Sequence, residues 1–223
     1  MRKEVLETFK NTSLKYIGNV NSLHGLGTLS KKLETAASKQ ILDILSLNDK
    51  EIIYTSDLSE SITLGVLGYL ENHNLKNKNI VIEKNINSSL DEISKKFNKN
   101  LEIRETNNIE SDVNKLVDDN TLIVCTNKYD DNLIKLCRSY GCIYFLILTE
   151  DNYFKDLNGI DLVCFDSLLF KGIPGIACLI KGKNLKLEPI INGGKSTTIY
   201  RSGTPSLPFI VSLAKSIRLE YKK

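Results

Sequence analysis

Short apolar runs alternate with longer segments of helical periodicity along almost the whole chain. Between residues 29 and 45, apolar side chains recur at spacings of three and four and so form one stripe of a helix. Further helices are predicted at 59–75, around 90–97, near 113–116, at 130–140 and at 207–221. Seven candidate strands lie between them, at 51–55, 80–82, 101–104, 122–125, 143–148, 162–165 and 176–180. The alternation predicts a three-layer α/β sandwich with a mostly parallel, seven-stranded sheet.

The strand at 143–148 is the most apolar of the seven, which predicts a central place in the sheet with cover on both faces. The last two strands, separated by the turn Gly172-Ile173-Pro174-Gly175, are candidates for antiparallel neighbours. No internal repeat or low-complexity linker interrupts the pattern. Residues 1–223 are therefore expected to form a single domain.

Composition narrows the class of protein. The 30 basic and 27 acidic side chains are interspersed, which indicates a solvated surface and argues against nucleic-acid binding. No stretch approaches the roughly 18 apolar residues of a membrane span, and no apolar signal core follows Met1. The five cysteines include no CxxC pair, as expected for buried thiols in a reducing compartment. These features predict a cytoplasmic protein without a membrane segment or a metal site.

A series of short motifs occurs in a fixed order. They are Gly18-Asn19-x-x-Ser22-x-His24-x-x-Gly27, Glu51-Ile52-Ile53-Tyr54-Thr55-Ser56 with Glu60-Ser61, Asp161-Leu162-Val163-x-Phe165-x-Ser167, Gly172-x-Pro174-Gly175-Ile176, Gly193-Gly194 and Arg201-Ser202-Gly203-Thr204. In order and spacing, the series resembles the large domain of cysteine desulfurases, pyridoxal-phosphate enzymes of the class V aminotransferase group. The resemblance covers nearly the whole chain. It implies the α/β architecture of that large domain, and it implies that the smaller C-terminal domain, with its nucleophilic cysteine loop, is absent.

The resemblance places Leu169 at the position of the lysine that forms the family's Schiff base with the cofactor. Leucine has no nitrogen, so no Schiff base can form there. The resemblance also places Ile147 where an aspartate would hold the pyridinium nitrogen, and Glu150 where a glutamine would contact the ring oxygen. Without that aspartate the ring is a poor electron sink. No catalytic residue is expected unless Lys171 acts as a displaced lysine, two residues further along a strand and on the same face.

The residues that the resemblance places around the cofactor phosphate and ring also differ from those of the family. Ser59 keeps a hydroxyl at a helix N-terminus, whereas Asp57 brings a negative charge to the place where a phosphate would sit. Asn87 replaces a ring-stacking imidazole. His24 lies in a matching motif away from the ring position, so a solvent-facing or helix-capping role is expected.

The segment that ends in Arg201-Ser202-Gly203-Thr204 has two interpretations. In the family it reaches toward the cofactor phosphate of the partner subunit, so its retention would indicate a dimer surface. Alternatively it is a Gly-rich turn before the last helix, with Arg201 paired to a carboxylate of its own domain.

Three hypotheses about function follow from these residues. The first is a cysteine desulfurase-like pseudo-enzyme without a cofactor, acting as a homodimer or as a partner of an active desulfurase or sulfur-transfer protein. The second is a pyridoxal-phosphate enzyme in which Lys171 replaces the family lysine. The third is a small-molecule binder that uses the emptied cofactor cleft. That degenerate pocket is expected to comprise His24, Ser59, Asn87, Ile147, Glu150, Arg201 and Thr204.

Overall fold

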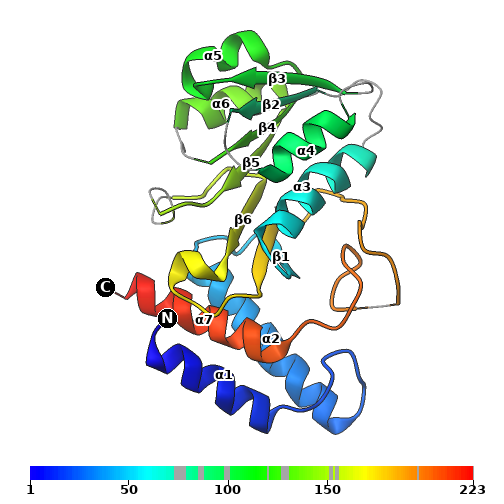
Figure 1. Cartoon of the computed structure of the whole chain (residues 1–223), viewed down its shortest axis with the longest axis vertical. Coiled ribbons are helices and arrows are strands. Elements are labelled where there is room, and N and C mark those ends of the chain that lie inside the picture. Colours follow the sequence, from blue (N-terminus) through cyan, green and yellow to red (C-terminus); the bar gives the residue numbers. More distant parts are fainter. Residues whose placement is uncertain are drawn as a thin grey trace.

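A seven-stranded sheet forms the middle layer of the molecule (Figure 1). The structure is a computed structural model that describes residues 1–72, 79–84, 88–97, 101–119, 121–126, 131–150, 153, 156–194 and 196–222. The strands are β1 (Lys50–Thr55), β2 (Asn79–Glu83), β3 (Glu102–Thr106), β4 (Thr121–Cys125), β5 (Ile143–Ile147), β6 (Leu162–Asp166) and β7 (Ala177–Gly182), in the order β1-β7-β6-β5-β4-β2-β3. Strands β2 to β6 pair in parallel, whereas β7 runs antiparallel to both β6 and β1. The predicted sheet and the antiparallel pairing of its last two strands are confirmed.

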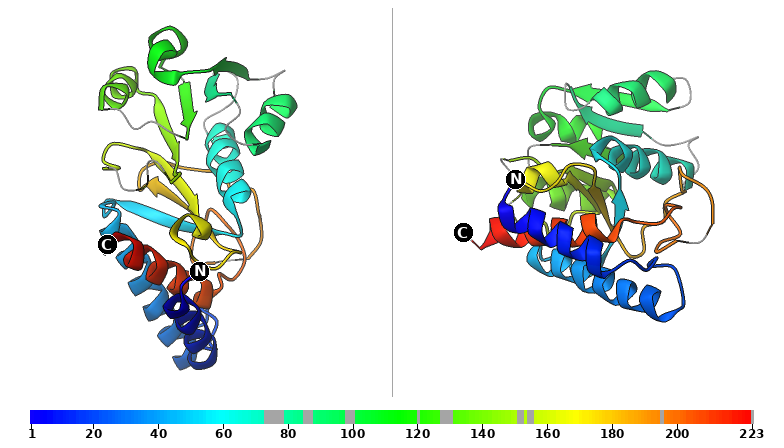
Figure 2. Two further views of the ribbon diagram at one scale, coloured as in Figure 1. Left: turned by 60° about the vertical axis from the view of Figure 1, so that its left-hand side comes forward. Right: turned by 60° about the horizontal axis from the view of Figure 1, so that its bottom comes forward.

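Helices cover both faces of the sheet (Figure 2). They are α1 (Lys3–Lys15), α2 (Gly25–Ile44), α3 (Leu58–Asn72), α4 (Ser88–Phe97), α5 (Ile109–Leu116), α6 (Asp131–Tyr140) and α7 (Leu207–Tyr221), with a short 3₁₀ helix at Ser167–Phe170. Helices α3 and α4 pack on one face, and α2, α5, α6 and α7 on the other. Along β5, Phe145 and Ile147 belong to the core under α3, while Tyr144 and Leu146 belong to the opposite core. The prediction of a central strand covered on both faces is thus confirmed.

Helix α1 is an element that the apolar pattern did not predict. It lies outside the layers and packs on α7, where the ring of Phe9 meets Phe209 edge-on with centroids 4.9 Å apart. Arg2, just before the helix, donates hydrogen bonds to Glu220 Oε1 at 2.6 Å and to the Leu219 carbonyl at 3.0 Å. Because α1 packs mainly on another helix, it buries few side chains, and only Val5 and Thr12 are fully buried.

The carboxyl ends of β1 and β6 meet the start of β7 at one edge of the sheet. In the strand register, Ala177 of β7 lies opposite both Thr55 of β1 and Asp166 of β6. Between β7 and α7, residues 197–200 line a shallow pocket together with Lys50, Glu51 and Ile52 of β1. Binding sites in open α/β sheets lie at such carboxyl edges. Within the described residues, no helix combines the length and the apolar character that crossing a membrane requires.

Candidate functional site

The first turn of α3, at the end of β1, is capped by the chain's own carboxylates. Asp57 precedes the helix, and its Oδ1 accepts a hydrogen bond of 2.8 Å from the backbone N–H of Glu60. Glu60 reaches back, and its Oε2 accepts from the backbone N–H and the hydroxyl of Ser56 at 2.8 and 2.7 Å. The hydroxyls of Thr55 and Ser61 share a buried hydrogen bond of 2.6 Å. The arrangement is similar to a capping box, but Glu60 returns to the N–H of Ser56, one residue before the cap, and it likewise stabilises the start of the helix.

Arg201 pairs with Glu60 in the same chain. Its Nε donates to Glu60 Oε1 at 2.8 Å, and its Nη2 lies 3.4 Å from Oε2. Burial raises the pKa of Glu60, but the hydrogen bonds from Arg201 and Ser56 outweigh burial and lower this pKa below its ordinary value. Of the two interpretations of Arg201, the structure therefore shows the pairing with a carboxylate of its own chain.

The segment that carries Arg201 is held by further contacts. The Tyr200 ring lies 4.3 Å from the Lys181 ammonium, measured to the ring centroid. Lys181 is fully buried on β7, donates to the Gly182 carbonyl at 3.0 Å and forms an ion pair with Glu51. The backbone N–H of Ser202 donates to the Ile191 carbonyl at 3.1 Å. Arg201 is thus presented to Glu60 by a segment fixed on both sides.

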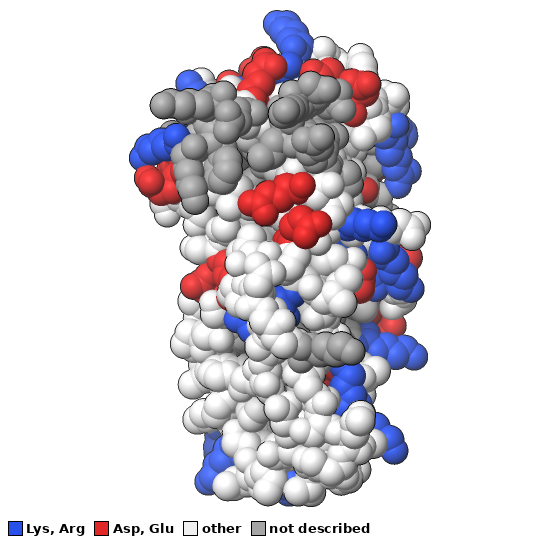
Figure 3. Space-filling model, turned by 90° about the vertical axis from the view of Figure 1, so that its right-hand side faces the viewer, with Lys and Arg blue, Asp and Glu red and all other residues white. Residues whose placement is uncertain are grey.

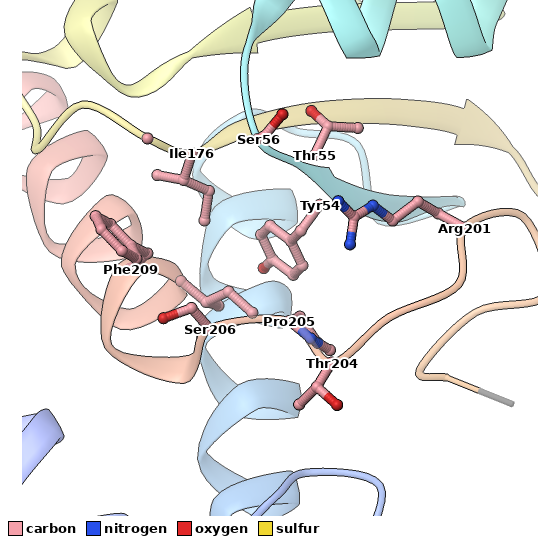
Figure 4. Close-up of a pocket in the computed structure, with 11 residues that line it drawn as sticks. Tyr54, Thr55, Ser56, Ile176, Arg201, Thr204, Pro205, Ser206 and Phe209 are labelled. Carbon is pink, nitrogen blue, oxygen red and sulfur yellow. The ribbon is translucent and has the colours of Figure 1, made fainter. Parts of the chain in front are cut away.

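A small cavity of about 180 Å³ opens beside Arg201 (Figure 4). It is lined by Tyr54, Thr55, Ser56, Gly175, Ile176, Arg201, Thr204, Pro205, Ser206, Phe209 and Ile210. Arg201 points from the segment before α7 toward the end of β1, and Ile176 and Phe209 form the apolar wall (Figure 4). Thr204 Oγ1 lies 3.3 Å from the side-chain amide of Asn19. Of the predicted pocket residues, the cavity brings together Arg201 and Thr204.

Leu169 lies in the 3₁₀ helix that follows β6. Asp166 caps this helix, and its Oδ1 accepts a hydrogen bond of 3.2 Å from the backbone N–H of Leu169. The side chain of Leu169 is partly buried and packs against the core on the α7 side of the sheet. The position that the resemblance assigns to the family lysine thus holds a packing residue in this chain.

The prediction that Lys171 lies on a strand is wrong. Lys171 follows the 3₁₀ helix in a left-handed conformation with φ of 57°, because the Asp166 cap ends β6 before this point. Its side chain is 58% exposed, and its Nζ lies 3.8 Å from Glu220 Oε1 of α7. Lys171 therefore does not share a strand face with position 169, and the argument that it could replace the family lysine from that face does not hold.

The remaining predicted pocket residues do not line the cavity. Ile147 is buried in the core under α3, Glu150 is exposed beyond β5, and Ser59 is exposed in the first turn of α3. Asn87 lies outside the described residues. His24 is the N-cap of α2, where its Nδ1 accepts from the backbone N–H of Gly27 at 3.3 Å, so the capping role is the one the structure shows.

The Gly18 to Gly27 motif has a packing role. A Cβ on Gly18 would collide with the carbonyl group of Leu26, and a Cβ on Gly27 would collide with the carbonyl oxygen of Ser22. The glycines therefore allow the segment before α2 to lie against the first turn of that helix.

Sequence reasoning noted Glu60 within a motif but missed it as a site residue. Two signals were available: an arginine expected to need a carboxylate, and a glutamate at the third position of a helix preceded by Asp57. Neither signal identifies the pair alone, because the two residues are 141 positions apart in sequence.

The side chains of this site do not fit pyridoxal phosphate, the cofactor that the resemblance implies. Its aldehyde needs an amine, and position 169, which the resemblance assigns to the lysine, holds a partly buried apolar side chain that packs against the core. Its phosphate needs donors, yet Asp57 places a carboxylate at the start of α3 and accepts the backbone N–H of Glu60. Its ring nitrogen needs a carboxylate, and Ile147 offers none.

Comparisons with known proteins agree with the fold. The family model for Aminotransferase class-V matches residues 1–223. The chain is 26% identical to a NifS/IcsS protein homolog of Lactobacillus delbrueckii subsp. bulgaricus, over 98% of this chain and 63% of that protein. It is also 26% identical to the cysteine desulfurase IscS of Dictyoglomus turgidum, over 98% of this chain and 61% of the relative.

Two solved structures share the architecture. A NifS-like protein superposes with a TM-score of 0.87 at 20% identity, covering 100% of this chain and 67% of that one. A NifS-like protein from Rickettsia africae superposes with a TM-score of 0.82 at 19% identity, covering 100% of this chain and 66% of that one. The chain spans about three-fifths of the length of the curated relatives it matches. By its match over its whole length, this chain belongs to the class-V aminotransferase family.

Proposed function

We propose that this chain is a cysteine desulfurase-like protein that has lost the Schiff-base chemistry of its family and acts as a binding subunit. The proposal rests on Leu169, a partly buried apolar residue that packs against the core, at the position that the resemblance assigns to the family lysine. A hydrocarbon side chain cannot become the covalent anchor of an aldehyde. Ile147, at the position of the ring-nitrogen partner, supports the same conclusion because it leaves a bound ring without its electron sink.

Lys171 is a poor replacement for the missing amine. Its Nζ lies 3.8 Å from the buried carboxylate of Glu220, in the turn after the 3₁₀ helix. The amine would have to leave this ion pair to anchor an aldehyde, which works against the displaced-lysine alternative.

An exposed apolar surface supports a role in binding another protein. It is formed by Ile17, Leu23, Leu26 and Leu29, all exposed, with Leu23 at 98%. Leu26 and Leu29 are three residues apart on α2 and so share a face, and the segment that carries Ile17 lies against Leu26. The lower half of the face in Figure 3, over the start of α2 and the segment before α7, carries few charged side chains. Exposed apolar side chains grouped at the start of one helix indicate a partner, which we propose to be a second copy, an active desulfurase or a sulfur-transfer protein.

The test for covalent chemistry is incubation with pyridoxal phosphate, borohydride reduction and peptide mapping. The proposal expects low, scattered labelling of exposed lysines that is the same in wild type and Lys171→Arg. The arginine variant is the matched control because it keeps the positive charge beside Glu220 and removes the primary amine. A single stoichiometric adduct at Lys171, lost in the variant, would contradict the proposal and establish the displaced-lysine enzyme.

The test for the binding surface is light scattering after size-exclusion chromatography, together with a pull-down. We expect a dimer or a captured desulfurase or sulfur-transfer protein, and we expect Leu26→Asp to abolish that association. Leu168→Asp is the control, because Leu168 is also an exposed leucine but lies in the 3₁₀ helix after β6, outside this surface. A monomer without a partner, or equal effects of both variants, would remove this part of the proposal.

The cavity beside Arg201 keeps small-molecule binding as a second candidate function. Its volume of about 180 Å³ is below the roughly 300–1,000 Å³ of most ligand pockets. Only a small ligand would fit, which favours the protein-binding role. Thermal-shift screening against phosphates, nucleotides and amino acids tests this candidate, because a ligand that binds the folded state raises the melting temperature.

A further inference from the structure

Strand β1 is the outermost strand at one end of the sheet and has β7 as its neighbour there. Lys50 lies opposite Gly182 of β7, but its backbone N–H donates to the Leu47 carbonyl at 3.0 Å, and the N–H of Gly182 donates to the Asp161 carbonyl at 3.0 Å. In an antiparallel ladder, pairs that exchange hydrogen bonds alternate with pairs that do not. The N–H and C=O of Ile52, two residues after Lys50, therefore also point away from β7. Among the residues that the structure describes, none forms a hydrogen bond with these two groups of Ile52.

A shallow pocket of about 480 Å³ lies along this open edge of the sheet. It is lined by α2 between Lys31 and Leu42, by residues 50–52 of β1 and by residues 197–200, and it is called the edge pocket below. The helical rise makes the distance from Lys31 to Leu42 about 16 Å, which is the length of about five residues in an extended chain. The volume of the edge pocket also lies within the roughly 300–1,000 Å³ of ligand pockets. The edge pocket therefore has room for a short extended segment beside β1.

Lys50 brings a buried ammonium group to the edge pocket. Its side chain is only 8% exposed, and the one carboxylate within ion-pair distance among the described residues is that of Asp49, whose Oδ2 lies 3.9 Å from Nζ, too far for a hydrogen bond. Burial raises the pKa of Asp161, and the charge of Lys50 lowers it in turn, yet no ion pair joins these two described residues. Buried polar groups normally have a hydrogen-bond partner, and an ammonium group most of all. A carboxylate carried by a ligand would provide one.

We propose that the edge pocket binds an extended peptide segment with a free C-terminal carboxylate, which adds to β1 as an antiparallel strand. In that orientation the C-terminus of the peptide lies at the start of β1, where Lys50 donates a charge-assisted hydrogen bond to its carboxylate. The N–H and C=O of Ile52 exchange backbone hydrogen bonds with the peptide, as in other cases of recognition by strand addition. The partner is therefore a protein or peptide whose last residues are extended and exposed. The inference goes beyond the proposed function, because it depends neither on the loss of Schiff-base chemistry nor on the apolar surface that contains Leu26.

The experiment is fluorescence polarisation of a labelled hexapeptide titrated with the intact chain. The peptide alternates threonine and valine, which favour an extended backbone, and ends in a free carboxylate. Two matched probes have the same sequence: one ends in an amide, and the other keeps the carboxylate but has N-methylated backbone amides. Lys50→Met removes the ammonium group and keeps an apolar stem, and circular dichroism verifies its fold. Lys3→Met is the control, because Lys3 is an exposed lysine on α1, outside the edge pocket.

We expect wild type and Lys3→Met to bind the acid peptide saturably and to bind the amide about tenfold more weakly, because the amide lacks the charge that Lys50 recognises. Lys50→Met should bind the acid and the amide equally, and the N-methylated probe should bind more weakly than the acid peptide. Leu26→Asp should bind the acid peptide as wild type does, which separates this inference from the proposed protein-binding surface. Wild type that fails to bind the acid peptide, or that binds the acid and the amide equally, would overturn the inference. So would a folded Lys50→Met protein that still prefers the acid, or binding that survives N-methylation.

Discussion

The pairing of Arg201 with Glu60 is open to a direct energetic test by a double-mutant cycle. The single variants are Arg201→Met, which removes the guanidinium and keeps a flexible apolar stem, and Glu60→Gln, which removes the charge and keeps the shape. The pair is well suited to this test, because Arg201 and Glu60 side chains are only 22% and 11% exposed and meet at 2.8 Å. A cycle isolates the interaction from the other contacts of each residue.

The expected magnitudes follow from these contacts. Hydrogen bonds to charged groups contribute about 1.5–3 kcal/mol, and loss of one partner leaves the other desolvated. Glu60 would keep its two bonds from Ser56. We therefore expect Arg201→Met to cost about 2 kcal/mol and Glu60→Gln about 1 kcal/mol, with a coupling energy near 1 kcal/mol.

The assay is urea unfolding followed by circular dichroism, with the free energy of unfolding extrapolated to water. The control cycle uses Lys95 and Glu92, an ion pair of 2.7 Å whose side chains are 71% and 73% exposed. Surface pairs of this kind couple by less than about 0.5 kcal/mol. A coupling energy for Arg201 and Glu60 no larger than that of the control would refute the reasoning, because the pair would then not hold the segment before α7.

Three further predictions use other contacts. The pKa of Glu60 is lower in the folded protein than its ordinary value of about 4.3. Ionised Glu60 therefore stabilises the folded state above that ordinary value, and this stabilisation is lost as the pH falls through the lowered pKa. The difference in unfolding free energy between wild type and Glu60→Gln should therefore shrink on acidification, and a constant difference from neutral to acidic pH would contradict this. Glu51→Ala should cost about 2 kcal/mol, because the fully buried Lys181 ammonium loses its carboxylate and keeps only the Gly182 carbonyl and the Tyr200 ring, whereas Lys181→Met should cost less than about 1 kcal/mol; equal costs in urea unfolding would contradict this asymmetry. Burial raises the pKa of Cys137 to about 12 and of Cys142 to about 11, and all five cysteines are buried. A thiol reagent should therefore label the native protein slowly and all five cysteines after unfolding. Rapid labelling of the native protein would refute this prediction.

The sheet was predictable because its signal is local. Runs such as Ile143 to Leu148 are apolar on both faces, and a central parallel strand requires that pattern. Helix α1 was not predictable in the same way, since it packs on α7 and buries only Val5 and Thr12 fully. A helix that covers another helix needs a narrower apolar stripe than one that covers a sheet.

The candidate site was predictable residue by residue but not as an arrangement. The sequence identified Leu169 and Arg201 by their places in motifs, because motif spacing is a local property. It left two partners open for Arg201, since the pairing with Glu60 depends on how the segment before α7 returns to the sheet edge. It misplaced Lys171, because the cap formed by Asp166 ends the strand earlier than the apolar pattern suggests.

The most direct test of the central claim is the visible absorption spectrum of the protein after incubation with pyridoxal phosphate and removal of free cofactor by desalting. The account predicts a colourless protein with no retained cofactor, because position 169 offers no amine and Asp57 brings a carboxylate to the start of α3. A retained, stoichiometric visible band that borohydride abolishes would contradict it, and would show that this family member still holds its cofactor.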